Sequence, residues 1–194
     1  ISVWSVVMAG SLVLVDTFTV SSSVSSVIIG GGSNGSSSYN YSIDDTFDVY
    51  KLVITNLRPS ADDAPFMRVT KSGSADTTSN YDVATRYMKA DTTHSNGYGA
   101  NGTKYDCMTT VDAGSEASGN GIYYLMNFAN SSEYSFGTIS QAHLQAAVHT
   151  VRGLHGGFTH TVASASDGVL VAFDNYASGS TIEEGKFSLY GIKK

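Results

Sequence analysis

Residues 47–57, with the sequence FDVYKLVITNL, carry apolar side chains at both odd and even positions. In an extended chain Val49 and Val53 point to one side and Leu52 and Ile54 to the other, because the side-chain period of a strand is two. Valine, isoleucine, tyrosine and phenylalanine favour a pleated backbone, whereas the asparagine near the end and the proline just after it are expected to stop the strand. The stretch therefore predicts a central strand that is covered on both faces.

Similar alternation recurs along the chain in short runs that are separated by turn-forming residues. These runs are residues 12–20, 66–71, 81–88, 105–111, 122–128, 169–173 and 185–192. About nine or ten short strands with turn signals between them are typical of an all-β protein. We therefore expect an antiparallel β-sandwich with a jelly-roll-like arrangement.

Two segments are harder to assign. Residues 141–152 place Leu144, Val148 and Val151 at helical spacing, but the same residues also fit an extended chain, and we favour two strands joined by a turn. Residues 91–104 are polar and contain several glycines, which predicts a long loop.

The charge of the chain limits the partners that it can bind. Charged residues make up 14% of the chain, against roughly 25% in a typical soluble domain, and the net charge is −6. A surface with few basic residues cannot neutralise phosphates or anionic lipids, so we expect neither nucleic acid nor a membrane as a partner. The single cysteine, Cys107, alternates with Tyr105 and Thr109, and we interpret it as a small buried hydrophobe.

The chain is long enough for one sizeable domain, which we assign to residues 8–194. Residues 1–7, ISVWSVV, are apolar but too short to span a bilayer. Met8 is followed by Ala9 and Gly10, which is typical of a natural start. We therefore interpret residues 1–7 as an N-terminal extension, a docking arm in which Trp4 makes the contact.

Two motif matches lie in surroundings that do not suit catalysis. Residues 31–35 fit the GxSxG pattern of hydrolases, but they lie in a Gly/Ser tract and not between a strand and a helix. Residues 97–102 fit the GxGxxG pattern of dinucleotide sites, but a strand is expected to follow them where such a site needs a helix. We therefore expect no catalytic residue and no cofactor.

Four histidines lie close together in the sequence, at His143, His149, His155 and His160. In an extended chain three of them could share a face and bind a metal. No cysteine or carboxylate lies among them, and histidines that pair with carbonyls or hydroxyls are more common. We therefore predict no metal site.

Aromatic and polar side chains gather in the segments rich in Gly, Ser and Asn. They are Tyr39, Tyr41, His94, Asn96, Tyr98 and Asn101. Tyrosine rings can stack on sugar rings, and histidine and asparagine can bond to sugar hydroxyls. Subunit interfaces prefer the same mixture of side chains, so both glycan contacts and partner contacts stay open for these residues.

Several stretches together resemble one group of proteins. They are residues 20–27 (VSSSVSSV), 45–60 (DTFDVYKLVITNLRPS) and 185–193 (GKFSLYGIK), with Gly179 before the last. They look like small structural proteins of tailed-bacteriophage virions, of the tail-fibre or capsid-surface type that is frequent among marine phages. The resemblance implies a β-sandwich displayed on a virion and no catalytic residues. The extension at residues 1–7 and the His- and Ala-rich residues 141–157 depart from the pattern.

The sequence thus predicts a non-enzymatic virion protein that decorates the head or forms part of a tail or fibre. We expect it to contact other copies of itself, with a trimer favoured by analogy, and other virion proteins. The predicted assembly contacts are Trp4, Phe187, Leu189, Tyr190 and Ile192. The alternative is a carbohydrate-binding module that recognises a polysaccharide on the host surface through Tyr98.

Overall fold

The computed structural model describes residues 11–31, 42–91, 94–145, 150–175 and 179–193. Thirteen strands and no helix are found among them. The strands are β1 (Leu12–Thr19), β2 (Ser26–Ile29), β3 (Val49–Pro59), β4 (Pro65–Lys71), β5 (Ser74–Ala75), β6 (Tyr81–Lys89), β7 (His94–Gly102), β8 (Tyr105–Asp106), β9 (Gly119–Met126), β10 (Ser135–Gln145), β11 (Thr150–His160), β12 (Gly168–Phe173) and β13 (Ile182–Ile192).

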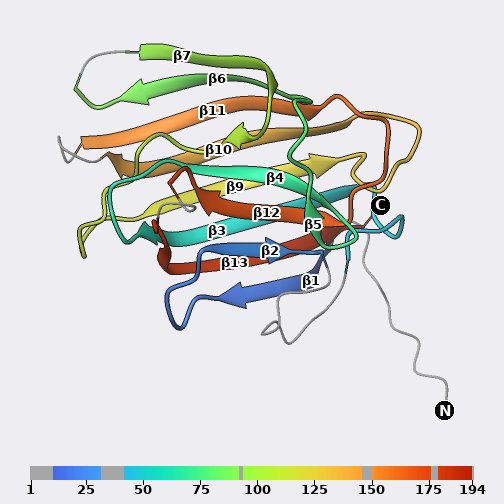
Figure 1. Ribbon diagram of the computed structural model, residues 1–194, viewed down its shortest axis with the longest axis horizontal. Helices are drawn as coiled ribbons and strands as arrows, with labels where there is room; N and C mark the ends of the chain where they lie inside the picture. The colour runs from blue at the N-terminus through green and yellow to red at the C-terminus, as the bar shows by residue number, and fades with distance from the viewer. Residues whose placement is uncertain (1–10, 32–41, 92–93, 146–149, 176–178, 194) are drawn as a thin grey trace.

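The strands form two antiparallel sheets that pack face to face (Figure 1). The large sheet has eight strands in the order β1-β13-β3-β9-β10-β11-β6-β7, and the small sheet has five, in the order β2-β12-β4-β5 with β8 beside β4. The predicted all-β, antiparallel β-sandwich is confirmed. The predicted number of strands is too low, because the two-residue strand β5 and the polar strand β7 have no apolar alternation in the sequence. The predicted strand at residues 105–111 is too long, since only its first two residues form a strand, β8.

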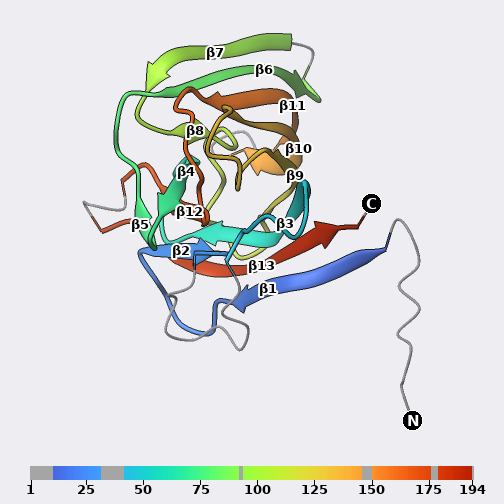
Figure 2. The ribbon, with the colours of Figure 1, turned by 90° about the vertical axis from the view of Figure 1, so that its right-hand side faces the viewer.

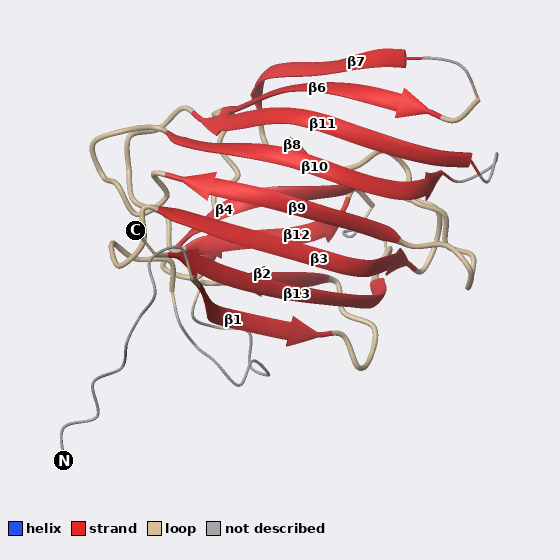
Figure 3. Cartoon of the chain, turned by 180° about the vertical axis from the view of Figure 1, so that it is seen from behind, coloured by secondary structure: helices blue, strands red, loops and turns tan. Residues whose placement is uncertain are grey.

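The small sheet covers only part of the large sheet, and only on one side. Figure 2 shows β2, β4 and β12 lying against the inner face of the large sheet, and Figure 3 shows that none of the described strands lies over its outer face. The core lies between the sheets, where Leu52 and Leu125 of the large sheet and Val69 and Val171 of the small sheet are all fully buried. Such burial of apolar surface is the main favourable contribution to folding.

Strand β3 is a central strand as predicted, but it is covered on one face only. Tyr50, Leu52 and Ile54 point into the core and are buried, while Val49 and Val53 on the outer face are partly exposed. The prediction of burial on both faces is therefore wrong. Apolar side chains on both sides of a strand do not distinguish a covered face from one that stays open to solvent.

Asn56 does not end this strand as expected. It has a left-handed backbone with a φ of 54°, and the pairing of β3 with β9 shifts between Ile54 and Leu57. The bulge shifts the alternation of side chains by one residue. Even-numbered residues point into the core before it, and the odd-numbered Leu57 is buried after it. The strand then continues to Pro59, where the expected stop is found.

The two segments that were hard to assign are both extended. Residues 141–152 contain the end of β10 and the start of β11, which pair as a hairpin, as favoured from the sequence. Residues 91–104 were predicted as a loop, but most of them form β7, which pairs with β6. Strand β7 lies at the edge of the sheet and consists mainly of Gly, Asn and Ser, so its sequence has no apolar alternation. It is a strand because its backbone pairs with the backbone of β6.

One glycine is required where β11 passes β6. A Cβ atom at Gly156 would lie 2.2 Å from the carbonyl oxygen of Ala84 and 2.6 Å from the Cα atom of Thr85, both of them backbone atoms of β6. A side chain therefore cannot be accepted here unless the two strands move apart.

We predict that Gly156→Ala lowers the free energy of unfolding by about 1–3 kcal/mol, because the added methyl group pushes β6 away from β11. The control is Gly99→Ala in β7, where the added Cβ would meet only Val83 Cγ1, at 3.6 Å. Chemical denaturation of both variants measures the effect. Equal stabilities would show that the contact between Gly156 and β6 is not tight.

Candidate functional site

Three of the predicted contact residues lie together on β7. His94, Asn96 and Tyr98 alternate along this edge strand and point to the outer side of the large sheet, opposite Met88, Arg86 and Ala84 of β6. Tyr98 is the most exposed large hydrophobic side chain among the described residues, with 88% of its surface accessible. These residues therefore form one open row, not a loop as expected.

Asn101 lies further along the same strand and plays a different part. Its backbone is left-handed, with a φ of 55°, and its N–H donates to Asp82 Oδ1 at 2.7 Å. Asparagine tolerates this conformation better than most residues, so Asn101 shapes the end of β7. Tyr39 and Tyr41 lie outside the described residues.

The predicted assembly contacts are only partly accessible. Phe187 and Leu189 of β13 are fully buried in the core, so the prediction that they contact another molecule is wrong. Strand β13 lies between β1 and β3, and its apolar residues that point inward hold the two sheets together. Tyr190 and Ile192 point outward and are partly exposed. Trp4 lies outside the described residues.

A broad apolar surface covers the outer side of the large sheet from β1 to β10, and we call it the apolar face. It consists of Leu12, Leu14, Val49, Val53, Ile122, Tyr124, Met126, Phe136, Tyr190 and Ile192. Leu12 is 50% exposed and Phe136 is 44% exposed. Sequence analysis named only Tyr190 and Ile192 of this surface as contacts, because it expected strands such as β3 to be covered on both faces.

The side chains of the apolar face lie in register across the strands. Leu14 pairs with Tyr190, Tyr190 with Lys51, and Lys51 with Tyr124, so that they form one row over four strands. The Lys51 ammonium lies 5.9 Å from the centre of the Tyr124 ring, where the face of the ring attracts the charge. The lysine stem therefore adds apolar contact surface within this row.

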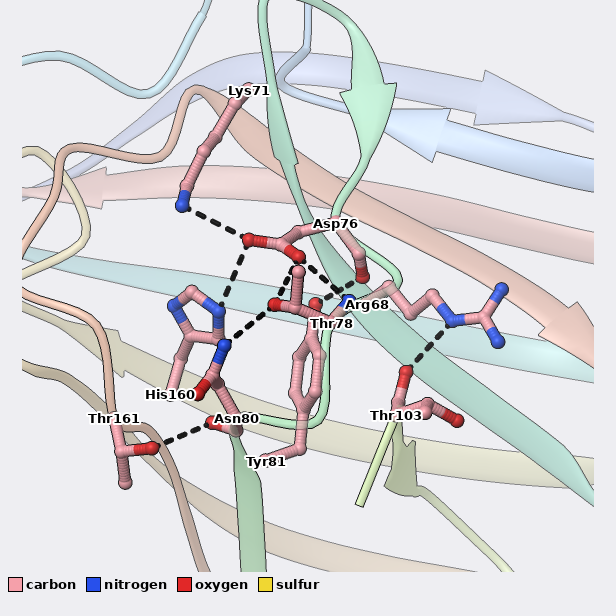
Figure 4. Close-up of polar contacts among 9 residues, drawn as sticks. All are labelled: Arg68, Lys71, Asp76, Thr78, Asn80, Tyr81, Thr103, His160 and Thr161. Carbon is pink, nitrogen blue, oxygen red and sulfur yellow. Dashed lines mark hydrogen bonds and ion pairs between the residues drawn. The ribbon is translucent and has the colours of Figure 1, made fainter. Parts of the chain in front are cut away.

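A partly buried polar cluster lies where the chain passes from the small sheet to the large sheet (Figure 4). Asp76 Oδ1 accepts hydrogen bonds from Thr78 N at 2.9 Å and from Thr78 Oγ1 at 2.5 Å, and Lys71 Nζ lies 3.0 Å from Asp76 Oδ2. Burial raises the pKa of the Asp76 carboxyl, but the bonds from Thr78 and the Lys71 charge outweigh it, so the pKa is well below its usual value.

His160 lies against this carboxylate but cannot act as a catalytic base toward a ligand. Its Nε2 is 3.4 Å from Asp76 Oδ2, its ring packs on Tyr81, and its side chain has no exposed surface. Burial and the nearby Lys71 lower the pKa of His160, although Asp76 acts in the opposite direction. The cluster fixes residues 76–80 between β5 and β6, which is a structural role.

The remaining histidines do not converge. His143 is buried on the inner face, with Nδ1 2.8 Å from Gln141 Oε1 and Nε2 2.8 Å from Thr109 Oγ1, whereas His155 is exposed on the outer face. The hairpin of β10 and β11 reverses the chain between them, so the even spacing in the sequence does not bring them together. His149 lies outside the described residues.

No group of three potential metal ligands is found among the residues that the structure describes. Within the same residues, no helix has the length and apolar character needed to cross a membrane. Cys107 is buried, and burial raises the pKa of its thiol well above the usual value, which disfavours the reactive thiolate. Comparison of the chain with protein-family models, with curated proteins and with solved structures finds no match.

We predict that stability falls as the pH drops from 6.5 toward 4, partly because of His143. Burial, and then the Arg152 charge, lower the pKa of His143 from 6.5 to about 4, so in this window the unfolded chain binds the proton more readily than the folded chain. The full shift corresponds to about 3 kcal/mol, which is present above pH 6.5 and is lost as the pH falls.

Urea denaturation at several pH values tests this, with His143→Gln to remove the titrating group and the exposed His155→Gln as the matched control. His143→Gln should reduce the dependence of stability on pH only in part, because burial also lowers the pKa of His160, which stays in the variant. An unchanged pH dependence in His143→Gln would contradict the role assigned to this residue.

Proposed function

We propose that this protein is a non-enzymatic structural component of a tailed-bacteriophage virion, either a head decoration or part of a tail or fibre. The virion assignment rests on the resemblance of residues 20–27, 45–60 and 185–193 to such proteins. We propose that the protein acts by binding other proteins. The observation that supports this is the apolar face, since exposed apolar patches of this kind mark contact surfaces.

The partner that fits the apolar face best is a second copy of the chain. Five neighbouring strands at about 4.8 Å spacing give a width of about 20 Å, and the apolar rows give the face an area of roughly 300–400 Å². A stable interface needs about 800 Å² from each partner, with an apolar centre and a polar rim. The polar part of the same sheet, toward β6 and β7, supplies such a rim.

Sheet geometry favours the same partner. All sheets twist with the same hand, and two of them pack well when their strands cross at about 30°. A second copy presents a sheet of the same twist and the same apolar character. The self-contact would add a layer to the sandwich, on the side of the large sheet that the small sheet leaves open.

We predict that Leu14→Glu weakens self-association by at least about tenfold, because it places a charge in the apolar face. The matched control is Met88→Glu, which makes the same kind of change on the outer side of β6. Leu14 and Met88 are 42% and 45% exposed, so neither change removes a core side chain. Analytical ultracentrifugation over a range of concentrations measures association, and thermal melting shows that both variants are folded.

Wild-type protein that stays monomeric at all concentrations would contradict self-association. An equal effect of Leu14→Glu and Met88→Glu would contradict the location of the contact on the apolar face. Contact between the same face of two copies has twofold symmetry and makes a dimer, so the trimer favoured by analogy with phage appendages would need a second, different contact between copies.

The virion assignment has its own test. We predict that quantitative mass spectrometry finds this chain in purified particles of the phage that encodes it, in fixed proportion to the major capsid protein. Hundreds of copies would support a head decoration, and a few copies in a multiple of three would support a tail or fibre element. Absence of the chain from washed particles would contradict the proposal.

A further inference from the structure

A shallow hollow lies on the outer side of the large sheet, beside the apolar face. It has a volume of about 340 Å³ and its outward-pointing lining residues are Asp82, Ala84, Phe136, Gly157 and Thr159. They come from β6, β10 and β11, which are neighbours in the sheet. The volume lies at the lower end of the range for ligand sites.

Missing side chains create the hollow. Gly157 and Ala84 pair with each other across β11 and β6, and together they supply only one methyl group to this part of the sheet. A Cβ atom built on Gly157 would lie 3.3 Å from the carbonyl oxygen of Gly137 and would meet no other heavy atom within 4 Å, so no side chain covers the glycine. The floor is therefore largely bare backbone.

Aromatic rings stand on two sides of this floor. Phe136 lines the hollow from β10, and Tyr98 of β7 is the register partner of Ala84 on the opposite side. Three strand spacings separate β10 from β7, a distance of about 14 Å, which leaves room for more than one six-membered ring. Both side chains are exposed, and Tyr98 projects almost entirely into solvent.

Polar groups lie along one edge. Phe136 pairs with Thr159, and Thr159 pairs with Asp82, so the hydroxyl and the carboxylate follow the phenylalanine in one row. Asp82 Oδ1 accepts the Asn101 N–H, and Thr159 Oγ1 donates to the carbonyl oxygen of Ser135 at 2.9 Å. These bonds orient the two groups, whose oxygens keep lone pairs that can accept hydrogen bonds from a ligand.

We infer that the hollow binds a neutral saccharide of at least two sugar rings, which lies across the strands between Phe136 and Tyr98. The apolar faces of pyranose rings pack on aromatic side chains, and their hydroxyls donate to carboxylate and hydroxyl oxygens. The Asp82 carboxylate disfavours an acidic sugar at the same position. Phe136 belongs to both the hollow and the apolar face, but the rest of the hollow lies on β6 and β11, outside that face, so Leu14→Glu separates sugar binding from self-association.

The test uses the purified full chain and amide NMR spectra with lactose, maltose and chitobiose as neutral probes, and sialyllactose as the acidic probe. At least one neutral disaccharide is expected to shift the amide signals of Gly157 and Ala84, with a dissociation constant of about 1 mM or below. Sialyllactose is expected to bind more weakly.

Two variants locate the site. Tyr98→Ala removes one ring, and Ala84→Leu fills the floor with a side chain that points to solvent, so each should weaken binding by about tenfold or more. Tyr190→Ala is the matched control, a tyrosine lost from the far side of the same sheet face, and it should leave binding unchanged. Leu14→Glu should also bind the sugar normally, even where it no longer self-associates.

Absence of shifts with all three neutral disaccharides at about 10 mM would overturn the inference. So would binding that persists unchanged in Tyr98→Ala and Ala84→Leu. Either result would leave the proposed assembly function untouched, since that function is measured by ultracentrifugation of Leu14→Glu.

Discussion

The contact between the inner face of the large sheet and the small sheet is the interaction on which the rest of the structure depends. Leu52, Ile54 and Leu189 on one side meet Val69 and Val171 on the other, and all five are almost completely removed from water. At about 25 cal/mol for each Å² of apolar surface, burial of this kind is the main interaction that holds the two sheets together. Because side chains alternate, every strand that buries one face in this contact presents its other face to the outside.

The small sheet has fewer strands than the large sheet, so it leaves part of the inner face of the large sheet uncovered. Strands β6 and β7 extend past the small sheet, and the gap on the inner face is filled by an aromatic cluster in which Tyr105 packs on Tyr81 and Phe158. Asp76 and its partners Lys71 and Thr78 fix the segment that joins the sheets beside this cluster. The buried His143 and His160 and the partly buried Asp76 thus have structural roles, and the surfaces that we assign to recognition lie on the outer face.

The sequence predicts the fold class well and the surfaces poorly. Period-two alternation identified the strands around Phe18, Leu52, Tyr123 and Val171 correctly, because the inward-pointing residues of a sandwich are apolar. The outward residues Val53, Ile122 and Tyr124 follow the same apolar pattern, and a sequence does not record which side of a sheet receives the second layer. Phe187 and Leu189 were therefore taken for contact residues although they are core residues.

The polar strand β7 could not be predicted for a related reason. Its glycines and asparagines carry no apolar periodicity, and it becomes a strand because β6 offers free backbone groups at the edge of the sheet. Tyr98 and Asn96, which the sequence suggests as contacts to a glycan or a partner, are exposed on this strand. The residues that the register places near Tyr98 are Phe136, Asp82 and Gly157. They lie on other strands, so a sequence does not show that they are close to Tyr98.

The central claim is that the protein binds its partners through the outer side of the large sheet. Hydroxyl-radical footprinting of the protein in its dilute and its assembled state tests this most directly. Mass spectrometry then gives the reactivity of each exposed side chain. The account predicts that Leu12, Leu14 and Ile122 lose reactivity on assembly, while Met88 on the outer side of β6 keeps it. Equal reactivity of Leu12, Leu14 and Ile122 in both states would show that the apolar face stays in water and would contradict the account.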